Sequence, residues 1–421
     1  MKARQILTGH ALRSLFGQMH GGSFSVTYCD STTQHFGDDE PQFQISFCDD
    51  SLLDLLHGDM LVNFGDAYMD GRMDFEGDLA DLMSLALRSG LMSATGEVKG
   101  LAGTALRVVG KLRSLNHEKE NIAHHYDLGN DFFSLWLDES LTYSCAYFHK
   151  TSDSLEQAQQ QKIDHSLRKL RLKPDESLLD IGCGWGALVM RAAEHFGGKA
   201  TGITLSEEQY AGASELIKAR GMQGHASVRL MHYSSLAREE QFDKIVSIGM
   251  MEHVGKANLA EFTRGVETML KPDGLALLHS ITVLKEGPVN GWIEKHIFPG
   301  GYVPTLSEIL SHLTSRDFRV WDVENLAPHY RMTLDHWSER FEQCVPLVRK
   351  KFSERFVRMW RLYLRASSAA FREGVVEVHQ ILVSRGQQSG LPLTREDLYS
   401  SSKHRVDERI SLVGRERCST V

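Results

Sequence analysis

The sequence predicts an α/β protein: a Rossmann-like fold with a seven-stranded, mostly parallel sheet, preceded by a smaller N-terminal α+β domain. The first observation is SLLDIGCGWG at residues 177–186, an apolar strand that ends in an acid and runs through a glycine loop into a helix. Asp180 stands at the carboxyl end of this strand, where open α/β sheets bind ligands. The second observation is the alternation of apolar strands with helices that follows. The third is the length of 421 residues, more than one core usually holds.

Each strand of the large sheet is expected where an apolar run is bounded by turn signals. The expected strands are Ser177–Ile181, Ala200–Leu205, Ser227–Met231, Phe242–Ile248, Leu275–Thr282, Val320–Asn325 and Val376–Val383. Helices are expected at 187–196 and 258–270, and Lys271-Pro272-Asp273-Gly274 is a turn signature after the second of them. The short crossovers predict a doubly wound parallel sheet, in which the last strands can form an antiparallel edge.

Residues 1–95 form the first expected unit. Phe24–Tyr28 and Phe43–Phe47 alternate apolar and polar residues and predict two strands, joined by a polar connector over 30–41. The other expected elements are a short helix at 49–56, a turn-rich segment at 64–74 and an apolar helix at 79–87. This unit has no glycine loop and no cluster of catalytic type, so we expect a lipid-binding or dimerisation domain there.

The remaining segments divide the chain further. Residues 96–120 are basic and interrupted by glycines, which predicts a solvated linker, with contact to anionic lipid headgroups as the alternative. Residues 121–386 hold the sheet domain, and residues 387–421 a polar tail. Aromatic residues gather at 121–148, where we expect a cap over the ligand, and in two insertions, 291–304 and 328–372, where we expect substrate recognition.

Composition excludes several function classes. The net charge of −8 disfavours a uniformly basic nucleic-acid surface. The six cysteines form no CxxC pair, so neither a metal site nor a disulfide framework is expected, and a reducing cytoplasm is favoured. The N-terminus shows no apolar run with a cleavage site, and no stretch approaches the roughly 20 apolar residues that span a bilayer. Any lipid contact is therefore expected to be peripheral.

The glycine spacing points to the ligand. It departs from the GxGxxG dinucleotide pattern, and GxGxG after an acid-ended strand resembles motif I of the Rossmann-like methyltransferases, which hold S-adenosylmethionine. Many of these enzymes grip the ribose with an acid at the end of the second strand. This chain has Thr204-Leu205 there, and Gln209 is the expected substitute.

Eight stretches occur in an order that is specific to one family. They are HHYDLGNDFF at 124–133, LTYSCAYF at 141–148, LDIGCGWG at 179–186, TGITLSEEQ at 201–209, IGMMEHVG at 248–255, LLHSI at 277–281, IFPGGYVP at 297–304 and PHYRMTL at 328–334. Together they resemble the cyclopropane-fatty-acyl-phospholipid synthases, relatives of the mycolic acid cyclopropane synthases. The resemblance covers residues 120–385 and extends loosely to FGDAYMDGRMD at 64–74.

The resemblance implies a class I methyltransferase that transfers a methylene from S-adenosylmethionine to a cis double bond of a phospholipid acyl chain. Methyl transfer to an alkene leaves a carbocation in an apolar pocket, and a proton must then leave the new methyl group. The family uses bicarbonate ion as the base. Its ligands carry over to Cys145, Glu252, His279, Ile281 and Tyr330. Aromatic faces at Tyr143, Phe148 and Tyr302 suit a cationic intermediate.

The same resemblance implies the cofactor-binding residues and the partners. The cofactor residues are Tyr143, Ser144, Asp180, Gly182, Cys183, Gly184, Trp185, Gly186, Thr204, Leu205, Ser206, Gln209, Tyr233 and Ser234. The implied partners are a phospholipid substrate and the inner face of the membrane, contacted peripherally from the cytoplasm. A homodimer is expected and nucleic acid is not.

Each candidate also has a structural interpretation when taken alone. Cys145 suits a small buried position, Glu252 a helix start, and His279 a satisfied core histidine. Many family members have a cysteine near the C-terminus where this chain has Ser367, which disfavours a thiolate mechanism and leaves the bicarbonate mechanism intact.

Three rival functions remain open from the sequence. One is an acyl C-methyltransferase that gives a methyl-branched or methyl-vinyl chain without closing a ring. Another is a small-molecule N-methyltransferase, disfavoured by the bicarbonate-type residues because an amine leaves no carbocation to deprotonate. The third is a lipid-binding protein with a vestigial cofactor site, disfavoured by the intact GxGxG loop.

Overall fold

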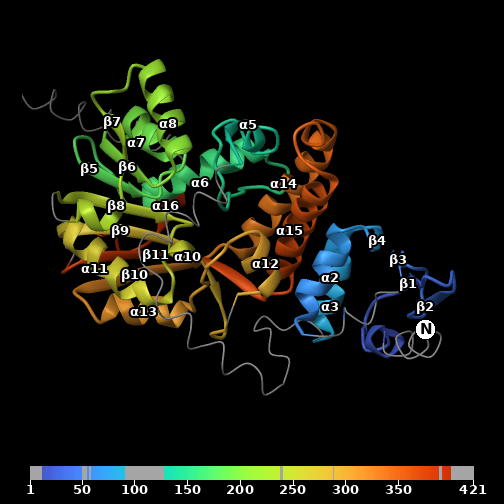
Figure 1. Ribbon diagram of the computed structural model, residues 1–421. Helices are drawn as coiled ribbons and strands as arrows, with labels where there is room; N and C mark the ends of the chain where they lie inside the picture. The colour runs from blue at the N-terminus through green and yellow to red at the C-terminus, as the bar shows by residue number, and fades with distance from the viewer. Residues whose placement is uncertain are drawn as a thin grey trace, which may run out of the picture.

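The computed structural model describes residues 12–49, 55, 58–90, 128–237, 240–287, 289–387 and 391–399. Figure 1 shows a small N-terminal sheet at one end, a large sheet covered by helices at the other, and two long helices between them. The expected linker at 96–120 and most of the expected helix at 49–56 lie outside the described residues. So do residues 121–127, which open the aromatic stretch.

The large sheet has seven strands in the order β10-β11-β9-β8-β5-β6-β7. Their bounds are β5 (Ser177–Ile181), β6 (Lys199–Thr204), β7 (Ala226–Leu230), β8 (Phe242–Ile248), β9 (Leu270–Val283), β10 (Phe318–Asn325) and β11 (Val376–Arg385). Strands β5 to β9 run parallel to their neighbours among themselves, whereas β11 is antiparallel to both β9 and β10. The predicted fold, including its antiparallel edge, is confirmed.

Helices cover both faces of this sheet because its strands are apolar on both sides. One core contains Leu178 together with residues of α6 (Leu155–Lys169), α7 (Ala187–Phe196) and α8 (Glu207–Ala219). The other contains Leu179 together with residues of α9 (Tyr233–Leu236), α11 (Leu259–Met269) and α13 (Leu306–Thr314). Successive strand residues point to opposite faces, so β5 anchors both layers at once.

The expected turn at 271–274 is incorporated into a strand. Strand β9 begins at Leu270, and its pairing with β8 shifts between the pairs Phe242–Leu270 and Lys244–Leu275. Asp273 adopts a φ of 60°, in the left-handed region that a turn sequence tolerates. The turn residues therefore form an irregularity within the edge of the ladder, and they do not end it.

The N-terminal domain has a sheet of four strands in the order β2-β1-β3-β4. Its elements are β1 (Phe24–Thr27), β2 (Thr33–Phe36), β3 (Phe43–Phe47), α2 (Met60–Met69), β4 (Met73–Glu76) and α3 (Leu79–Arg88). Two expectations were wrong. The polar connector contains β2, and the segment expected to be turn-rich completes α2 and begins β4.

Tertiary packing explains why α2 forms in spite of its sequence. Asp59 caps the helix by accepting hydrogen bonds from the backbone N–H groups of Leu61 and Val62. Gly65 lowers helix propensity, yet a Cβ at this position would lie 2.3 Å from the Trp292 ring. The glycine is therefore required for α2 to pack against α12 (Gly291–His296).

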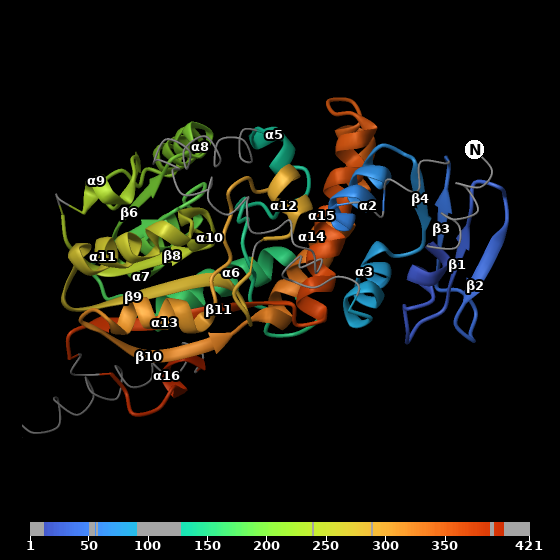
Figure 2. The same ribbon diagram turned by 60° about the horizontal axis from the view of Figure 1, so that its bottom comes forward.

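Two long helices join the domains. Helices α14 (Ala327–Val348) and α15 (Glu354–Arg372) pack against each other, and α15 also packs against α2 and α3 (Figure 2). One hydrophobic core runs from the N-terminal sheet through this pair to the aromatic residues around α5 (Asn130–Phe133). Within the described residues, no helix combines the length and the apolar character needed to cross a bilayer.

Candidate active site

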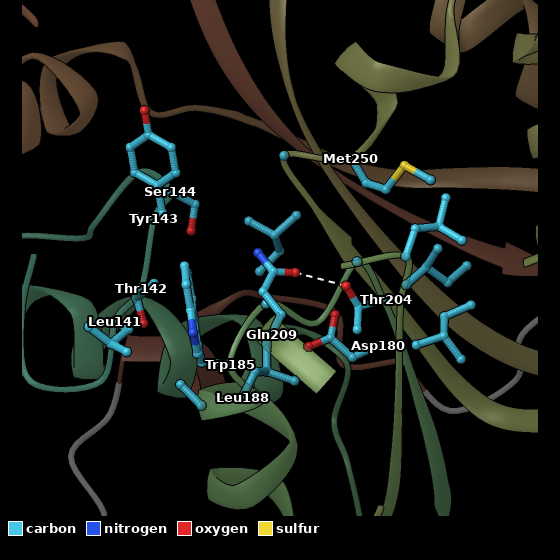
Figure 3. Close-up of a pocket in the computed structure, with 18 of the residues that line it drawn as sticks. Leu141, Thr142, Tyr143, Ser144, Asp180, Trp185, Leu188, Thr204, Gln209 and Met250 are labelled. Carbon is cyan, nitrogen blue, oxygen red and sulfur yellow. Dashed lines mark hydrogen bonds between the residues drawn. The ribbon is translucent and has the colours of Figure 1, made fainter. Parts of the chain in front are cut away.

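A first cavity opens at the carboxyl ends of β5, β6 and β8 (Figure 3). Its floor is the glycine loop, where Gly182 and Gly184 have φ values of 83° and 55°. A side chain at Gly182 would be strained by this positive φ, and its Cβ would lie 3.0 Å from the Met250 side chain. Residues 140–144 form the opposite wall, so the aromatic stretch does cover this cavity as expected.

Gln209 is oriented by Thr204. The Thr204 hydroxyl accepts from the backbone N–H of Ser206 at 3.1 Å and donates to Gln209 Oε1 at 2.8 Å. Figure 3 shows the amide nitrogen of Gln209 pointing away from Thr204. Gln209 therefore offers N–H groups on the cavity side, whereas an acid at this place would offer only acceptors.

Opposite charges line the first cavity. Lys162 on α6 is 3% exposed and donates to Ser144 Oγ at 3.0 Å, and Asp180 is 4% exposed. Burial lowers the pKa of Lys162 to about 8 and raises the pKa of Asp180 to about 7. A buried ammonium and a buried carboxyl in one cavity match a ligand that carries both charges, such as an amino-acid group.

Most of the residues predicted to bind the cofactor line this cavity. They are Tyr143, Ser144, Asp180, Gly182, Gly184, Trp185, Thr204, Leu205, Gln209 and Tyr233. Four predicted residues are not among the lining residues and support the wall instead. Cys183 packs behind the loop against Gly202, Gly186 begins α7 at a φ of 80°, Ser206 caps α8, and Ser234 contacts His232.

A second cavity adjoins the first and has a volume of about 260 Å³. Tyr143, Ser144, Gly249 and His253 line both cavities and mark their junction. All five residues predicted to bind the bicarbonate line the second cavity, although they come from four separate segments of the chain: Cys145, Glu252, His279 with Ile281, and Tyr330. Whether they bind that ion stays a prediction.

Glu252 and His279 form a buried polar corner in this cavity. Glu252 lies on α10 (Met251–Val254), and its Oε1 accepts from the backbone N–H of Ile281 at 2.6 Å. The other carboxyl oxygen, Oε2, and the His279 Nε2 atom are buried and have no hydrogen-bond partner among the residues that the structure describes. Buried polar atoms are rarely left unsatisfied, so the corner fits a small polar guest.

Burial sets the protonation of these groups. It raises the pKa of Glu252 to about 7, against the opposing hydrogen bond from Ile281, and it lowers the pKa of His279 to about 3. It also raises the pKa of the Cys145 thiol far above its usual range, so this thiol is not a nucleophile at neutral pH. The corner is therefore uncharged at His279 and Cys145 and titrates at Glu252 near neutrality.

The rest of the second cavity is mostly apolar, and both domains build it. Leu61, Met83 and Leu87 of the N-terminal domain face residues of α12, α14 and α15 across it. A third, apolar cavity shares Leu61, Met83, Asn290, Ile293 and Ala366 with the second and continues into the N-terminal domain. The N-terminal domain therefore forms part of the cavity wall.

The structure also locates three other residues named in the sequence analysis: Tyr302, Ser367 and Phe148. Tyr302 lines the second cavity and donates to Glu308 at 2.6 Å. Ser367, the position at which the resemblance led us to expect a cysteine in many family members, also lines it. Phe148 is not among the lining residues, because its ring stacks on His336, with centroids 5.5 Å apart.

Sequence reasoning missed residues that act from outside the motifs. Lys162 gave no signal because a lysine within an amphipathic helix is usually exposed. Tyr363 of α15 lines the second cavity, and its hydroxyl lies 2.8 Å from that of Tyr143. Gln380 of β11 contacts His279, and no local pattern reveals a partner across a sheet.

The doubly wound sheet with β11 antiparallel, together with the glycine loop and the charged cavity above it, defines an S-adenosylmethionine-dependent methyltransferase. The family described as mycolic acid cyclopropane synthetase matches residues 113–381, and a domain of unknown function, DUF7884, matches residues 11–95. The chain belongs to the mycolic acid cyclopropane synthetase family.

Named relatives cover most of the chain. It is 39% identical to a cyclopropane-fatty-acyl-phospholipid synthase of Escherichia coli K12, over 79% of this chain and 86% of the relative. It is 36% identical to a probable fatty acid methyltransferase of Pseudomonas putida, over 85% and 92%. Among solved structures, mycolic acid cyclopropane synthase CmaA1 complexed with SAH and CTAB superposes with a TM-score of 0.60 at 34% identity, covering 65% of this chain and 99% of that one.

Proposed function

We propose that this enzyme is a cyclopropane-fatty-acyl-phospholipid synthase that modifies cis double bonds of unsaturated phospholipid chains. The observation that carries the proposal is the pair of unpartnered buried atoms, Glu252 Oε2 and His279 Nε2, in an apolar cavity that adjoins the methyl-donor cavity. Methyl transfer to an amine forms no carbocation, so it requires no base that removes a proton from carbon. A cyclopropane synthase requires one, because the ring closes only when the transferred methyl loses a proton.

The first cavity would hold S-adenosylmethionine, which when bound supplies the methyl group. Asp180 would face its ammonium group, and Lys162 its carboxylate. Gln209 would donate to a ribose hydroxyl, since Thr204 occupies its amide oxygen. Tyr143 at the junction would present its ring to positive charge.

The polar corner would hold bicarbonate, which when bound supplies a base inside an otherwise apolar cavity. The residues present fit this anion. Glu252 Oε2 can accept its hydroxyl proton, and His279 can donate from Nε2 to one of its oxygens. Tyr330 reaches the same cavity from the first turn of α14, and the apolar remainder of the cavity excludes water from the reacting carbons.

The second and third cavities would accept the acyl chain. Four of the five residues that line both cavities are apolar, and the third cavity extends from them into the N-terminal domain. On this proposal the N-terminal domain, residues 1–95, binds lipid and the enzyme works as a homodimer at the inner face of the membrane. Flotation with phospholipid vesicles and sedimentation velocity of the full chain test these two points.

The decisive experiment is incubation with S-adenosylmethionine and vesicles of monounsaturated phospholipid. We expect a gain of one methylene per modified chain, a ring at the former double bond on fragmentation, and lower rates in carbonate-free buffer. A branched or methyl-vinyl chain would favour the second candidate, an acyl C-methyltransferase, which the name of the Pseudomonas putida relative brings forward. No gain in mass would refute both.

A further inference from the structure

Gln380 contacts the Nδ1 atom of His279, the histidine of the polar corner. It lies on β11 directly opposite His279 on β9, and the two side chains are 0% and 2% exposed. Its Nε2 atom lies 3.2 Å from His279 Nδ1 and 3.2 Å from Ser166 Oγ on α6. Gln380 and Ser166 are not among the residues that line either cavity, so they act only through His279.

The direction of this hydrogen-bond chain is fixed at its far end. The Ser166 hydroxyl donates to the backbone oxygen of Lys162 at 2.9 Å, and a carbonyl oxygen can only accept. Because the single hydroxyl proton of Ser166 is used in that hydrogen bond, its Oγ accepts a hydrogen bond from Gln380. With the hydroxyl in this position, the Gln380 group nearest Ser166 is the NH₂, and its second N–H is directed to His279 Nδ1. This orientation leaves Gln380 Oε1 buried without a partner among the described residues.

A neutral imidazole that accepts at Nδ1 carries its proton on Nε2. His279 is neutral because burial, reinforced by the nearby charges of Lys162 and Lys169, lowers its pKa to about 3. The tautomer, and not the charge, therefore decides what His279 presents at Nε2. His279 Nε2 is buried and has no hydrogen-bond partner within the described part of the chain.

We propose that Gln380, held by Ser166, is a positioning residue that fixes His279 as the Nε2–H tautomer, so that His279 donates a hydrogen bond into the polar corner. The proposal rests on the proposed function, since an N–H aimed into this corner selects an anion such as bicarbonate. The opposite tautomer would aim a lone pair at the anion and repel it.

The tautomer can be measured without any assay of activity. Nitrogen NMR of the full-length enzyme labelled with ¹⁵N-histidine reports which ring nitrogen is protonated, and the His279→Gln variant identifies the signal by its loss. We expect His279 to be protonated at Nε2 and bare at Nδ1. Protonation at Nδ1 in the unmodified enzyme overturns the proposal.

Gln380→Glu tests the cause, because a carboxylate of the same shape can only accept. We expect Nδ1 of His279 to become protonated and kcat to fall on the order of 10- to 100-fold, as when outer partners of ligating histidines are removed, with KM for S-adenosylmethionine nearly unchanged. Ser384→Ala is the matched control. Ser384 is equally buried on β11 and contacts Trp321 and Gly386, so this variant should keep the kcat and tautomer of the unmodified enzyme.

Circular dichroism would reveal misfolding of Gln380→Glu. In that case a second variant, Ser166→Ala, still tests the proposal. Ser166→Ala frees the Gln380 amide to rotate, so we expect a mixture of His279 tautomers and a smaller loss of kcat. An unchanged tautomer and kcat in both variants would overturn the role of Gln380.

The bicarbonate proposal and the positioning role of Gln380 can fail independently. If carbonate-free buffer does not slow the unmodified enzyme while its His279 is protonated at Nε2, the bicarbonate proposal fails and the positioning role stands. If bicarbonate dependence is normal but Nδ1 is protonated, the positioning role fails and the proposed function stands.

Discussion

The hydroxyls of Tyr143 and Tyr363 lie 2.8 Å apart at the junction of the two cavities, although 220 positions separate them in the chain. Tyr143 lines both cavities, whereas Tyr363 lies on α15, the helix that packs against α2 and α3 of the N-terminal domain. This contact connects the methyl-donor side of the site to the domain that forms the outer part of the lipid cavity.

Tyr363→Phe should therefore reduce turnover with lipid. It removes one hydrogen bond from Tyr143 while keeping the ring that packs on Trp360. A hydrogen bond of this kind contributes about 0.5–1.5 kcal/mol, so kcat/KM for phospholipid should fall about 2- to 10-fold. Steady-state kinetics with vesicles measure this. A change larger in the S-adenosylmethionine affinity than in kcat/KM for lipid would contradict it.

Glu252→Gln should abolish most activity and leave cofactor affinity nearly unchanged. The amide still accepts from the Ile281 N–H, but it puts an NH₂ or a neutral oxygen where Oε2 could accept a proton. The expected loss in kcat is about 10²- to 10⁴-fold, the usual contribution of a positioned acid or base. Calorimetry with S-adenosylmethionine provides the second readout, and an equal loss of binding would mean that Glu252 belongs to the cofactor site.

Tyr330→Phe is the companion test on a different helix. Tyr330 lies on α14 with its ring 4.6 Å from that of Phe371, so the phenylalanine keeps this packing and loses only the hydroxyl. We expect a large loss of kcat with an intact fold and intact cofactor binding. Activity equal to that of the unmodified enzyme would remove Tyr330 from the polar corner's function.

Cofactor binding should strengthen as pH rises through neutrality. Burial raises the pKa of Asp180 to about 7, against the opposing charge of Lys162, so below pH 7 this carboxyl is mostly neutral. A cationic ligand group prefers the ionised form, and each pH unit below the pKa then weakens binding by up to about tenfold. Calorimetric titrations from pH 5.5 to 7 measure the slope, below the pKa of about 8 at which Lys162 loses its charge. The Asp180→Asn variant should bind more weakly with a flat profile, and a persistent slope would assign the titration to another group.

Elements with a local sequence signal were predicted accurately, whereas elements that depend on tertiary packing were not. Strand β8 and helix α7 were predicted to the residue because an apolar run between turn signals needs no tertiary partner to be recognised. Helix α2 was missed because Gly65, Gly71 and the aspartates of 64–74 favour turns locally, and packing against Trp292 and α15 overrides them.

The same limit applies to the site. Glu252 and His279 were predicted because they sit in motifs that resemble those of the family, and the structure brings both to one cavity. Gln380 was not found, because its contact with His279 depends on the register between β11 and β9, which no local pattern contains. Residues that act through another residue leave the weakest trace in a single sequence.

Arg358 joins α15 to the N-terminal domain, and we call this contact region the seam between the domains. Arg358 of α15 is 18% exposed and donates to the backbone oxygens of Tyr68 and Met73 at 3.0 and 3.4 Å, and its guanidinium lies 5.1 Å from the centre of the Tyr68 ring. Arg358→Ala removes these two hydrogen bonds and the contact with the Tyr68 ring, while the Gly71 N–H still donates to the Tyr68 oxygen. The free energy of unfolding should therefore fall by about 1–3 kcal/mol.

Arg349→Ala is the control for that change. Arg349 pairs with Glu354 at the outer end of the helix pair, both side chains are 50% exposed, and exposed pairs contribute at most about 1 kcal/mol. Urea unfolding of both variants gives the comparison. Because Leu61 and Met83 come from the domain that Arg358 anchors, Arg358→Ala should also raise KM for phospholipid while KM for S-adenosylmethionine stays constant. Equal effects of the two substitutions would mean that Arg358 contributes no more than an exposed ion pair, and that the lipid cavity does not depend on this arginine.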